Sequence, residues 1–289
     1  MEEYEKFAEA GKIAGEALKE GIKWVREGIR YREVAEKIEE YIKARGAMPA
    51  FPVNISVNNI AAHFTPSQSC MDVFKKGDVV KIDVGAHING CIGDTAKTVE
   101  IGTKKYAKLI EAAEEALRAA IDSIKAGIKI GEIGEIIEEK IKEYGFTPIK
   151  NLHGHSLERY KLHAGLSIPN FKNKSKVELK EGQIVAIEPF ATDGLGMVVD
   201  AGLGNIYRIE KDSIMARELK KRFNGLPFAE RWLYEIYGEK VPFKLSFLLK
   251  RRIIAPYFKL IEAKGGMVSQ AEHTLFITKE GCEILTEIK

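Results

Sequence analysis

Residues 79–100 read VVKIDVGAHINGCIGDTAKTVE and predict a β-hairpin that turns at Asn89-Gly90. Asp83 lies in the first arm and Asp94 in the second, so a turn near residue 89 places them opposite or diagonal to one another on one face of the ladder. Two neighbouring carboxylates in an apolar strand pair repel each other and resist ionisation. A divalent cation between them would remove that repulsion. The hairpin alone leaves open a solvated face that carries two unrelated aspartates.

The composition limits the classes of protein that the chain can belong to. With 289 residues, 45% of them apolar, it can form one large domain or two ordinary ones. A net charge of +3 does not indicate a nucleic-acid or membrane-surface protein. Three cysteines at spacings unlike a zinc site or a disulfide framework predict reduced thiols and a cytoplasmic protein. No apolar run predicts a signal peptide or a membrane span.

The sequence also contains an internal repeat. Amphipathic helices predicted over 3–26 and 31–45 recur over 104–126 and 131–144. Glycine and proline lie at the ends of the shorter helix in each pair, at the same spacing: Gly28, Gly46 and Pro49 in the first, and Gly127, Gly145 and Pro148 in the second.

The repeat continues into the strands. The segment FKKGDVVKID at 74–83 parallels LKEGQIVAIE at 179–188, which makes Glu188 the counterpart of Asp83. Carboxylates at equivalent points of duplicated halves, facing each other across an approximate two-fold axis, predict a shared site rather than a structural core.

The second half diverges after Glu188. Residues 270–277 are predicted to form the returning strand, on which Glu272 would mirror Asp94. Residues 210–256 between them are predicted to form a small helical insertion. Its basic end, 250–252, could contact RNA, although a solvated helix end is the simpler interpretation.

The histidines gather near the same strands in both halves. His63 follows the first helix pair, and His155 and His163 follow the second. The carboxylates and one imidazole form an oxygen-rich set: Asp83, Asp94, His155, Glu188 and Glu272. Four carboxylates balance two divalent cations, and the donor types suit Mn, Fe, Co or Zn. Two such metals can activate a water molecule and stabilise a tetrahedral oxyanion.

Three further histidines receive other interpretations. His87 at the hairpin tip is expected to be solvated. His273, next to Glu272 on a strand, is expected to point to the opposite face and to be structural. His153, which precedes a glycine, could act directly in the site or be structural, and a structural or supporting role is favoured.

These residues resemble methionine aminopeptidase of type 2, in its archaeal form. The matching segments span nearly the whole chain: AAHFTP at 61–66, KIDVG at 81–85, GH at 154–155, HAG at 163–165, IEPF at 187–190 and QAEHT at 270–274. The segment AERWL at 229–233 resembles the insertion that separates type 2 from type 1. The resemblance implies an α+β pita-bread fold, in which two pseudo-symmetric halves surround an antiparallel sheet. It also implies one catalytic domain over 1–289, with the insertion at 210–256.

The resemblance also implies roles for particular residues. Two divalent metals (Co, Mn, Fe or Zn) would be bound by Asp83, Asp94, His155, Glu188 and Glu272, with Asp94 and Glu272 bridging. The catalytic residues would be Glu188 as general base, His63 near the substrate amine and scissile amide, and His163 at the scissile carbonyl and developing oxyanion. The methionine side chain would contact Phe51, Leu162 and Tyr257. Ile206 departs from eukaryotic members, which have histidine there, and this affects the pocket shape rather than the chemistry.

The expected function is the removal of the initiator methionine from nascent proteins with a small second residue. The partners would be nascent polypeptide N-termini, with the ribosome as a further candidate, no membrane, no specific nucleic acid, and a monomeric chain. An Xaa-Pro aminopeptidase or dipeptidase on the same fold is the alternative. A non-catalytic relative that binds the ribosome or RNA is a third hypothesis, but such relatives characteristically lose metal ligands, and all five are present here.

Overall fold

The structure, a computed structural model, describes residues 2–287. The outermost residues of the predicted 1–289 domain, 1 and 288–289, lie outside the described residues. Four long helices form at the predicted places: α1 (Glu2–Trp24), α2 (Tyr31–Ala44), α3 (Ala107–Ser123) and α4 (Ile130–Glu143). Apolar side chains at helical spacing form one buried stripe on each helix, because only that face packs on the sheet.

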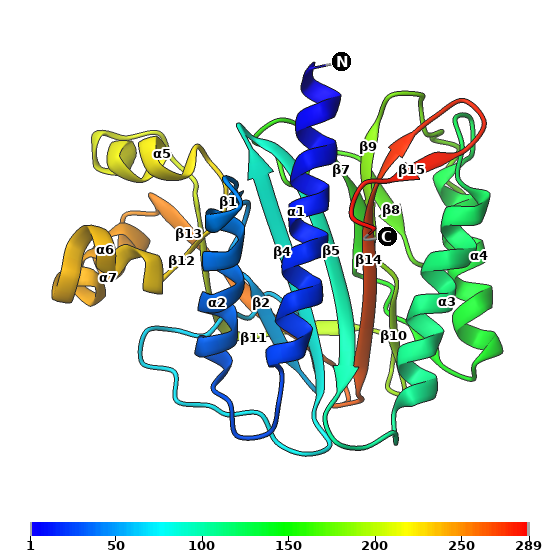
Figure 1. Ribbon diagram of the computed structural model, residues 1–289, viewed down its shortest axis with the longest axis horizontal. Coiled ribbons are helices and arrows are strands. Elements are labelled where there is room, and N and C mark those ends of the chain that lie inside the picture. Colours follow the sequence, from blue (N-terminus) through cyan, green and yellow to red (C-terminus); the bar gives the residue numbers. More distant parts are fainter. Residues whose placement is uncertain (1, 288–289) are drawn as a thin grey trace.

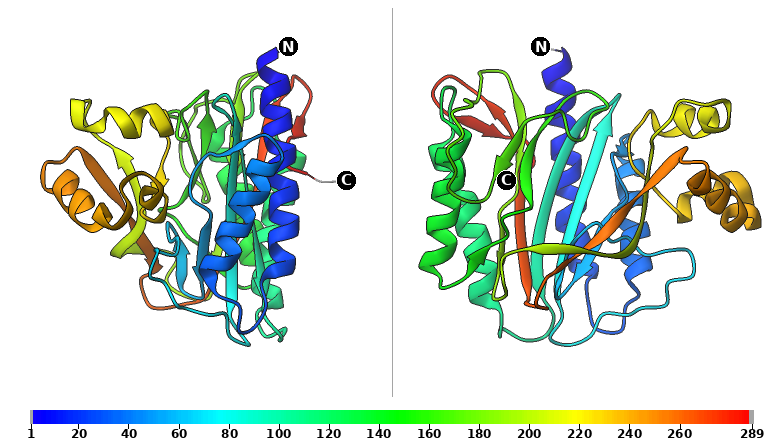
Figure 2. Two further views of the ribbon diagram at one scale, coloured as in Figure 1. Left: turned by 60° about the vertical axis from the view of Figure 1, so that its left-hand side comes forward. Right: turned by 180° about the vertical axis from the view of Figure 1, so that it is seen from behind.

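An eleven-stranded sheet lies behind these helices, and its main strand order is β1-β4-β5-β14-β9-β7-β8. Its strands are β1 (Met48–Pro49), β2 (Asn54–Val57), β4 (Val79–Ile88), β5 (Cys91–Glu100), β6 (Thr147–Pro148), β7 (His153–Leu157), β8 (Ser167–Pro169), β9 (Ile184–Ile187), β10 (Phe190–Thr192), β14 (Val268–Ile277) and β15 (Cys282–Ile284). Every strand pairing given for the described residues is antiparallel. The four helices cover one face of this sheet (Figure 1), and the insertion projects on the other side (Figure 2). The predicted α+β class with an antiparallel sheet is confirmed.

The predicted hairpin over 79–100 forms with the expected turn. Asn89 and Gly90 both have positive φ values, 50° and 89°, as a type I′ turn requires. Asp94 pairs with Gly85, and Asp83 pairs with Ala96. The two aspartates are therefore diagonal neighbours on one face of the ladder, which is one of the two arrangements that the sequence predicted.

Each half of the molecule has its own apolar core. One core joins α1 and α2 to β2 and β4, and a second joins α3 and α4 to β9 and β14. The halves meet where β5 pairs with β14, at the middle of the sheet. Side chains on the open face of these central strands therefore come from both halves.

A second, four-stranded sheet was not anticipated. It has the order β12-β11-β13-β3, with β3 (Ile60–Ala62), β11 (Val198–Ile209), β12 (Phe228–Ala229) and β13 (Ile254–Glu262). The register of β11 against β13 shifts twice, between Asp200 and Leu203 and between Leu203 and Ile206. These irregularities, with glycine and asparagine inside β11, interrupt the alternation from which strands are recognised.

The insertion lies between β11 and β13 and is mostly helical. It contains η1 (Ile214–Ala216), α5 (Arg217–Phe223), η2 (Arg231–Leu233), α6 (Tyr234–Tyr237), η3 (Gly238–Lys240) and α7 (Val241–Lys250). Leu219, Phe228 and Leu233 are fully buried in its own core. The predicted boundary at 256 is too late, because residues 254–256 already pair with β11 as part of β13. None of the described helices combines the length and apolarity needed to cross a bilayer.

Candidate metal centre

The central strands carry the predicted ligands in two rows across the open face of the large sheet. Asp83 and Glu272 both pair with Ala96 of β5, so they flank that strand in one row. Ile187 pairs with His273 and Phe190 with Gln270, a constant register that places Glu188 opposite Glu272 in the same row.

Asp94 and His155 occupy the adjacent row. The Asp94 amide donates to the hydroxyl of Thr274, and that hydroxyl donates to the Asp94 carbonyl, each at 2.8 Å. Thr274 and His155 both pair with Ala186. Glu272 lies opposite Glu188, whereas Asp94 is diagonal to Asp83, so the predicted correspondence of Glu272 with Asp94 is only approximate.

The side chains of the two rows converge. His155 Nε2 lies 3.4 Å from Glu188 Oε1 and 3.7 Å from Asp94 Oδ2. Ligand atoms of Asp94, His155 and Glu272 lie within 4.8 Å of one another, and these three residues are buried. Beyond the effect of burial, the Asp83 carboxyl is close enough to Asp94 for its charge to raise the pKa of the Asp94 carboxyl. All five predicted ligands therefore belong to one cluster.

The protein resists ionisation of this cluster when no cation is present. Burial raises the pKa of Asp83 to about 7. Burial, with the neighbouring Asp83 charge, raises the pKa of Asp94 well above its usual range. The pKa values of Glu188 and Glu272 are also raised well above their usual range by burial and by the charge of Asp94. Conversely, burial and then His163 lower the pKa of His155 to about 3, so its imidazole is neutral and can donate a lone pair.

A divalent cation fits this donor set. Oδ1 of Asp83 and Oδ1 of Asp94 are buried without a hydrogen-bond partner in the protein, which is costly unless another ligand binds them. Four carboxyl groups and a neutral imidazole match the preferences of Mn, Fe, Co or Zn. The chemistry of the side chains thus supports a metal, independently of any resemblance.

Two further predicted histidines lie beside the cluster. The rings of His163 and His155 have centroids 4.4 Å apart, and the His63 ring meets Tyr257 edge to face at 5.3 Å. Burial and then His163 lower the pKa of His63 to about 4. Burial and then Arg208 lower the pKa of His163. Both imidazoles are neutral near pH 7, so each can offer one N–H donor.

A cavity of about 400 Å³ opens over the cluster. Its lining includes all ten residues that the sequence analysis singled out for the site: Phe51, His63, Asp83, Asp94, His155, Leu162, His163, Glu188, Tyr257 and Glu272. Ile206, which pairs with Tyr257 across β11 and β13, lines it too. The Phe51 ring packs over Gly85, where a Cβ would lie 2.2 Å from it, so glycine in the motif at 81–85 makes room for this wall.

The other histidines differ in how well they match their predictions. His273 is on the face away from the cavity, and its Nδ1 is 2.8 Å from the Thr286 hydroxyl, as a structural residue would be. His153 contacts the Lys150 carbonyl and the Ser167 hydroxyl, each at 2.9 Å, and lines the cavity rim. The prediction for His87 is wrong: it is half-buried, accepts a hydrogen bond from the Gly90 amide and packs on Tyr160. The tight turn folds the ring back instead of exposing it.

Two site residues were not identified from the sequence. Gln270 Nε2 donates to Glu272 Oε2 at 3.2 Å, and against the larger effect of burial the Gln270 amide also lowers the pKa of Asp83. Its position two residues before Glu272, on the same strand face, was a usable signal. Asn54 pairs with Asp83 from β2 and lines the cavity. Nothing in its local sequence distinguishes it.

The chain forms two similar halves around an antiparallel sheet, and buried carboxylates and an imidazole lie at the base of one cavity. This combination of fold and site defines a protein of the metallohydrolase class. The chain belongs to metallopeptidase family M24, whose model matches residues 5–217.

The comparison with individual proteins gives a more specific similarity. The chain is 46% identical to a methionine aminopeptidase of Methanocaldococcus jannaschii, over 99% of both chains. It is 45% identical to a methionine aminopeptidase of Thermococcus onnurineus, over 99% of this chain and all of the relative. The crystal structure of a methionine aminopeptidase from Thermotoga maritima superposes with a TM-score of 0.74 at 28% identity, covering 99% of this chain and 97% of that one.

Proposed function

We propose that this protein is a metal-dependent aminopeptidase that removes the N-terminal methionine from polypeptides whose second residue is small. The observation that carries the proposal is the convergence of four raised-pKa carboxyl groups and a neutral imidazole at the base of an open cavity. The near-full-length similarity to methionine aminopeptidases supports the choice of substrate.

In this proposal the five clustered side chains would hold two divalent cations, with Asp94 and Glu272 as the ligands common to both. Asp94 and Glu272 are the two most central carboxylates, because they lie on the paired strands β5 and β14 where the halves meet. Bound cations supply Lewis acidity and lower the pKa of a water molecule at the site. Co, Mn, Fe and Zn are all compatible with the donor set.

The residues of the chain then divide the proton transfers and the positioning of the substrate. Glu188, 3.4 Å from His155 and partly exposed to the cavity, takes a proton from the attacking water and returns it to the leaving amine. His163 donates its N–H to the scissile carbonyl oxygen, where negative charge develops. His63 hydrogen-bonds near the substrate amine and the scissile amide.

The substrate methionine lies against the apolar part of the cavity wall. Phe51, Leu162 and Tyr257 line this wall and offer a hydrophobic surface for an unbranched thioether. Ile206 adds a further aliphatic side chain beside Tyr257. An apolar wall of this kind favours methionine over a charged or polar first residue.

Hydrolysis of Met-Ala-Ser and Ala-Pro-Ser by chelator-treated protein tests the function, before and after Mn, Co, Fe or Zn is restored. Metal-dependent release of methionine from the first peptide alone is the expected result. Cleavage of Ala-Pro-Ser instead would move the protein to the Xaa-Pro peptidases. Metal analysis of the dialysed active protein measures the number of bound ions, for which two is expected.

Nascent chain N-termini are the proposed partners, in a cytoplasmic location that the three free cysteines favour. The ribosome is a further proposed partner, and the charge of the insertion supports it. Residues 210–253 contain eleven Lys and Arg against six Asp and Glu, so this segment is more basic than the whole chain at +3. Salt-sensitive co-sedimentation with ribosomes tests this partner, and an unchanged pellet fraction after neutralising 250–252 would exclude the basic end as the contact.

A further inference from the structure

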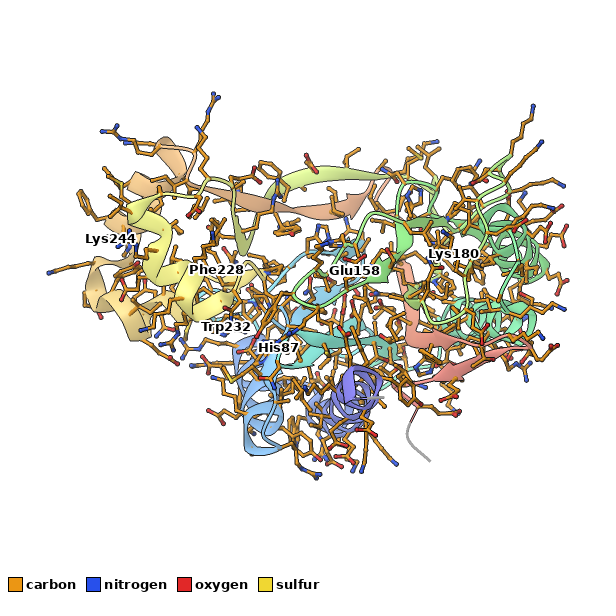
Figure 3. The ribbon with its side chains drawn as sticks, turned by 90° about the horizontal axis from the view of Figure 1, so that it is seen from above. His87, Glu158, Lys180, Phe228, Trp232 and Lys244 are labelled. Carbon is orange, nitrogen blue, oxygen red and sulfur yellow. The ribbon has the colours of Figure 1, made fainter. Side chains whose placement is uncertain are left out.

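A buried ion pair joins the insertion to the first half of the molecule. Arg231 Nη2 contacts Glu39 Oε1, and the two side chains are only 2% and 4% exposed. Trp232 Nε1 donates to the second Glu39 oxygen at 2.8 Å. Figure 3 shows Trp232 where the insertion meets α2, the helix that carries Glu39. Breaking such a pair leaves an uncompensated buried charge, so its geometry is strongly held.

The ion pair is one side of a closed ring of hydrogen bonds. The Val53 amide donates to Glu39 Oε1 at 3.1 Å, and the Thr65 hydroxyl donates to the Val53 carbonyl at 2.7 Å. Arg231 Nη1 completes the ring by donating to the Thr65 hydroxyl at 2.7 Å, and it also donates to the Pro66 carbonyl at 3.1 Å. Four segments that are distant in sequence are thereby fixed to one another.

Two residues of the proposed active site lie immediately beside this ring. Phe51 precedes Val53 by two residues, and His63 precedes Thr65 by two, and both line the metal cavity. The ring therefore fixes the backbone on which a wall of the cavity and one imidazole depend.

The backbone at His63 needs such support. His63 has φ 62°, in the left-handed region that non-glycine residues rarely adopt. The Thr65 amide bonds the Gly204 carbonyl at 3.0 Å, and a Cβ at Gly204 would lie 1.8 Å from the His63 carbonyl oxygen. A non-glycine residue stays in this conformation only where several surrounding contacts hold its backbone there.

We propose that Arg231 is a positioning residue, through which the insertion holds His63 against the metal centre by way of Thr65. This inference rests on the proposed function. It gives the insertion a role in the reaction besides any surface contact. The planar guanidinium is required, because one fork reaches Glu39, Thr65 and Pro66 together, whereas a lysine ammonium cannot keep all three contacts in that geometry.

The first experiment compares Thr65→Val with Thr65→Ser in the metal-loaded full-length protein. Valine keeps the shape but removes the hydroxyl that joins Arg231 to Val53, and serine keeps that hydroxyl. Thr65→Val should lower kcat for Met-Ala-Ser by about 10- to 100-fold with little change in KM, the cost of a misplaced group. Thr65→Ser should retain wild-type kcat, and both variants should retain wild-type metal content.

A double-mutant cycle separates positioning of His63 from a general structural effect. In a His63→Ala background, Thr65→Val should lower kcat little further, because the group it positions is already absent. Additive losses in the cycle would overturn the proposal, since they would mean that Thr65 acts independently of His63.

Arg231→Lys provides a second variant, and Arg222→Lys in the same insertion is its matched control. Arg222 makes an exposed ion pair with Glu235, so its replacement should leave kcat unchanged. Arg231→Lys should lower kcat as Thr65→Val does. If Arg231→Lys does not fold, the Thr65 pair decides the question.

The outcomes distinguish the two proposals. A metal-loaded wild-type protein that releases no methionine from Met-Ala-Ser would refute the proposed function. A wild-type protein that is active, with Thr65→Val equally active, would refute only the positioning role.

Discussion

The two halves of the molecule have matching turns and strand pairings, but two equivalent positions carry side chains with different contacts. Their turns match in detail: the paired glycines at equivalent places all have φ between 82° and 89°, at Gly28 and Gly127, Gly46 and Gly145, and Gly77 and Gly182. The Gly28 amide bonds the Phe74 carbonyl at 2.8 Å, as the Gly127 amide bonds the Leu179 carbonyl. Left-handed turns accept glycine at little cost, so these positions preserve the repeat where other side chains have diverged.

The first difference lies at the position of His155, the imidazole of the proposed metal site. His155 of β7 pairs with Ala186 of β9, whereas the equivalent pair in the first half is Ser56 of β2 and Lys81 of β4. Lys81 is fully buried, which lowers the pKa of its amine well below the usual range, and its Nζ donates to the Asn58 carbonyl at 2.7 Å. The first half therefore has a serine, paired with a buried lysine, where the second half has an imidazole paired with an alanine.

The second difference lies at one glutamate of the second helix of each half. Glu39 is buried and binds Arg231 of the insertion, whereas its counterpart Glu138 bonds the exposed Lys142 at 2.6 Å and the Lys172 amide at 2.8 Å. The same position therefore anchors the insertion in one half and lies near solvent in the other. The duplicated backbone places Glu39 and Glu138 at equivalent positions, but the residues that contact each glutamate differ, and so does its structural role.

Asp83 and Glu188, the two carboxylates related by the repeat, give the strongest test of whether the halves contribute equally to the proposed metal site. Asp83→Asn and Glu188→Gln should each lower kcat/KM for Met-Ala-Ser by about 10²–10⁴-fold with the fold retained, because both remove a charge from the cluster. Circular dichroism verifies the fold, and metal analysis measures occupancy. Asp200→Asn, an exposed residue of β11, is the control. Full activity in either variant would mean that the equivalent carboxylates of the two halves do not contribute equally to the reaction.

Metal removal should expose the repulsion between the carboxyls of the two halves. Between pH 4 and the raised pKa of Asp83, about 7, the folded protein holds a proton that the unfolded chain releases. The contribution of Asp83 to the free energy of unfolding of the metal-free protein should therefore fall as the pH rises through this range. The buried histidines, whose pKa values are lowered, contribute with the opposite sign, so the contribution of Asp83 is measured as the difference in unfolding free energy between the wild type and Asp83→Asn. Thermal unfolding of both proteins from pH 4 to 8 should show this difference falling with pH, and a difference that rises would contradict the raised pKa of Asp83.

The two equivalent glutamates should differ in their contribution to stability. Glu39→Gln leaves Arg231 buried without its counter-charge and should cost about 3–5 kcal/mol of unfolding free energy. Glu138→Gln loses a pair with Lys142, whose side chain is 61% exposed, and should cost less than about 1 kcal/mol. Urea unfolding of the metal-loaded proteins measures both values. Equal losses would mean that the insertion contact adds nothing to the first half.

The smallest effects should be alike in the two halves. A Cβ at Gly46 or Gly145 meets no atom within 4 Å, so alanine there costs only the left-handed conformation. Gly46→Ala and Gly145→Ala should each lower the free energy of unfolding by roughly 1–2 kcal/mol. A difference larger than that between the two variants would show that one turn is conformationally distinct. Chemical denaturation at one pH is sufficient for this comparison.

Much of the fold could be predicted because it depends on patterns among residues that are close in the sequence. The turn at Asn89-Gly90, the amphipathic helices and the repeated glycines each act within a few residues, so the hairpin and the two halves could be recognised without distances. The second sheet could not, because β11 and β13 are separated by the insertion and β11 is broken by two register shifts.

The site residues also divide into those that local sequence patterns predict and those that they do not. Period-two spacing and the repeat brought Asp83, Asp94, Glu188 and Glu272 to one face, whereas Phe51, Leu162 and Tyr257 and the role of His63 came from the resemblance. The fold-back of His87 at the turn was missed, because it depends on a contact with Tyr160 that is 73 positions away in the chain.

The backbone repeat and the face that carries the carboxylates follow from residue order alone, because turn chemistry and strand alternation are local. The ring of Glu39, Val53, Thr65 and Arg231, and the row that runs from Asp83 through Glu272 to Glu188, exist only in the folded molecule. Those relations depend on register and on packing between distant segments, where the alignment of one strand against another, rather than any residue's own preference, sets which side chains meet.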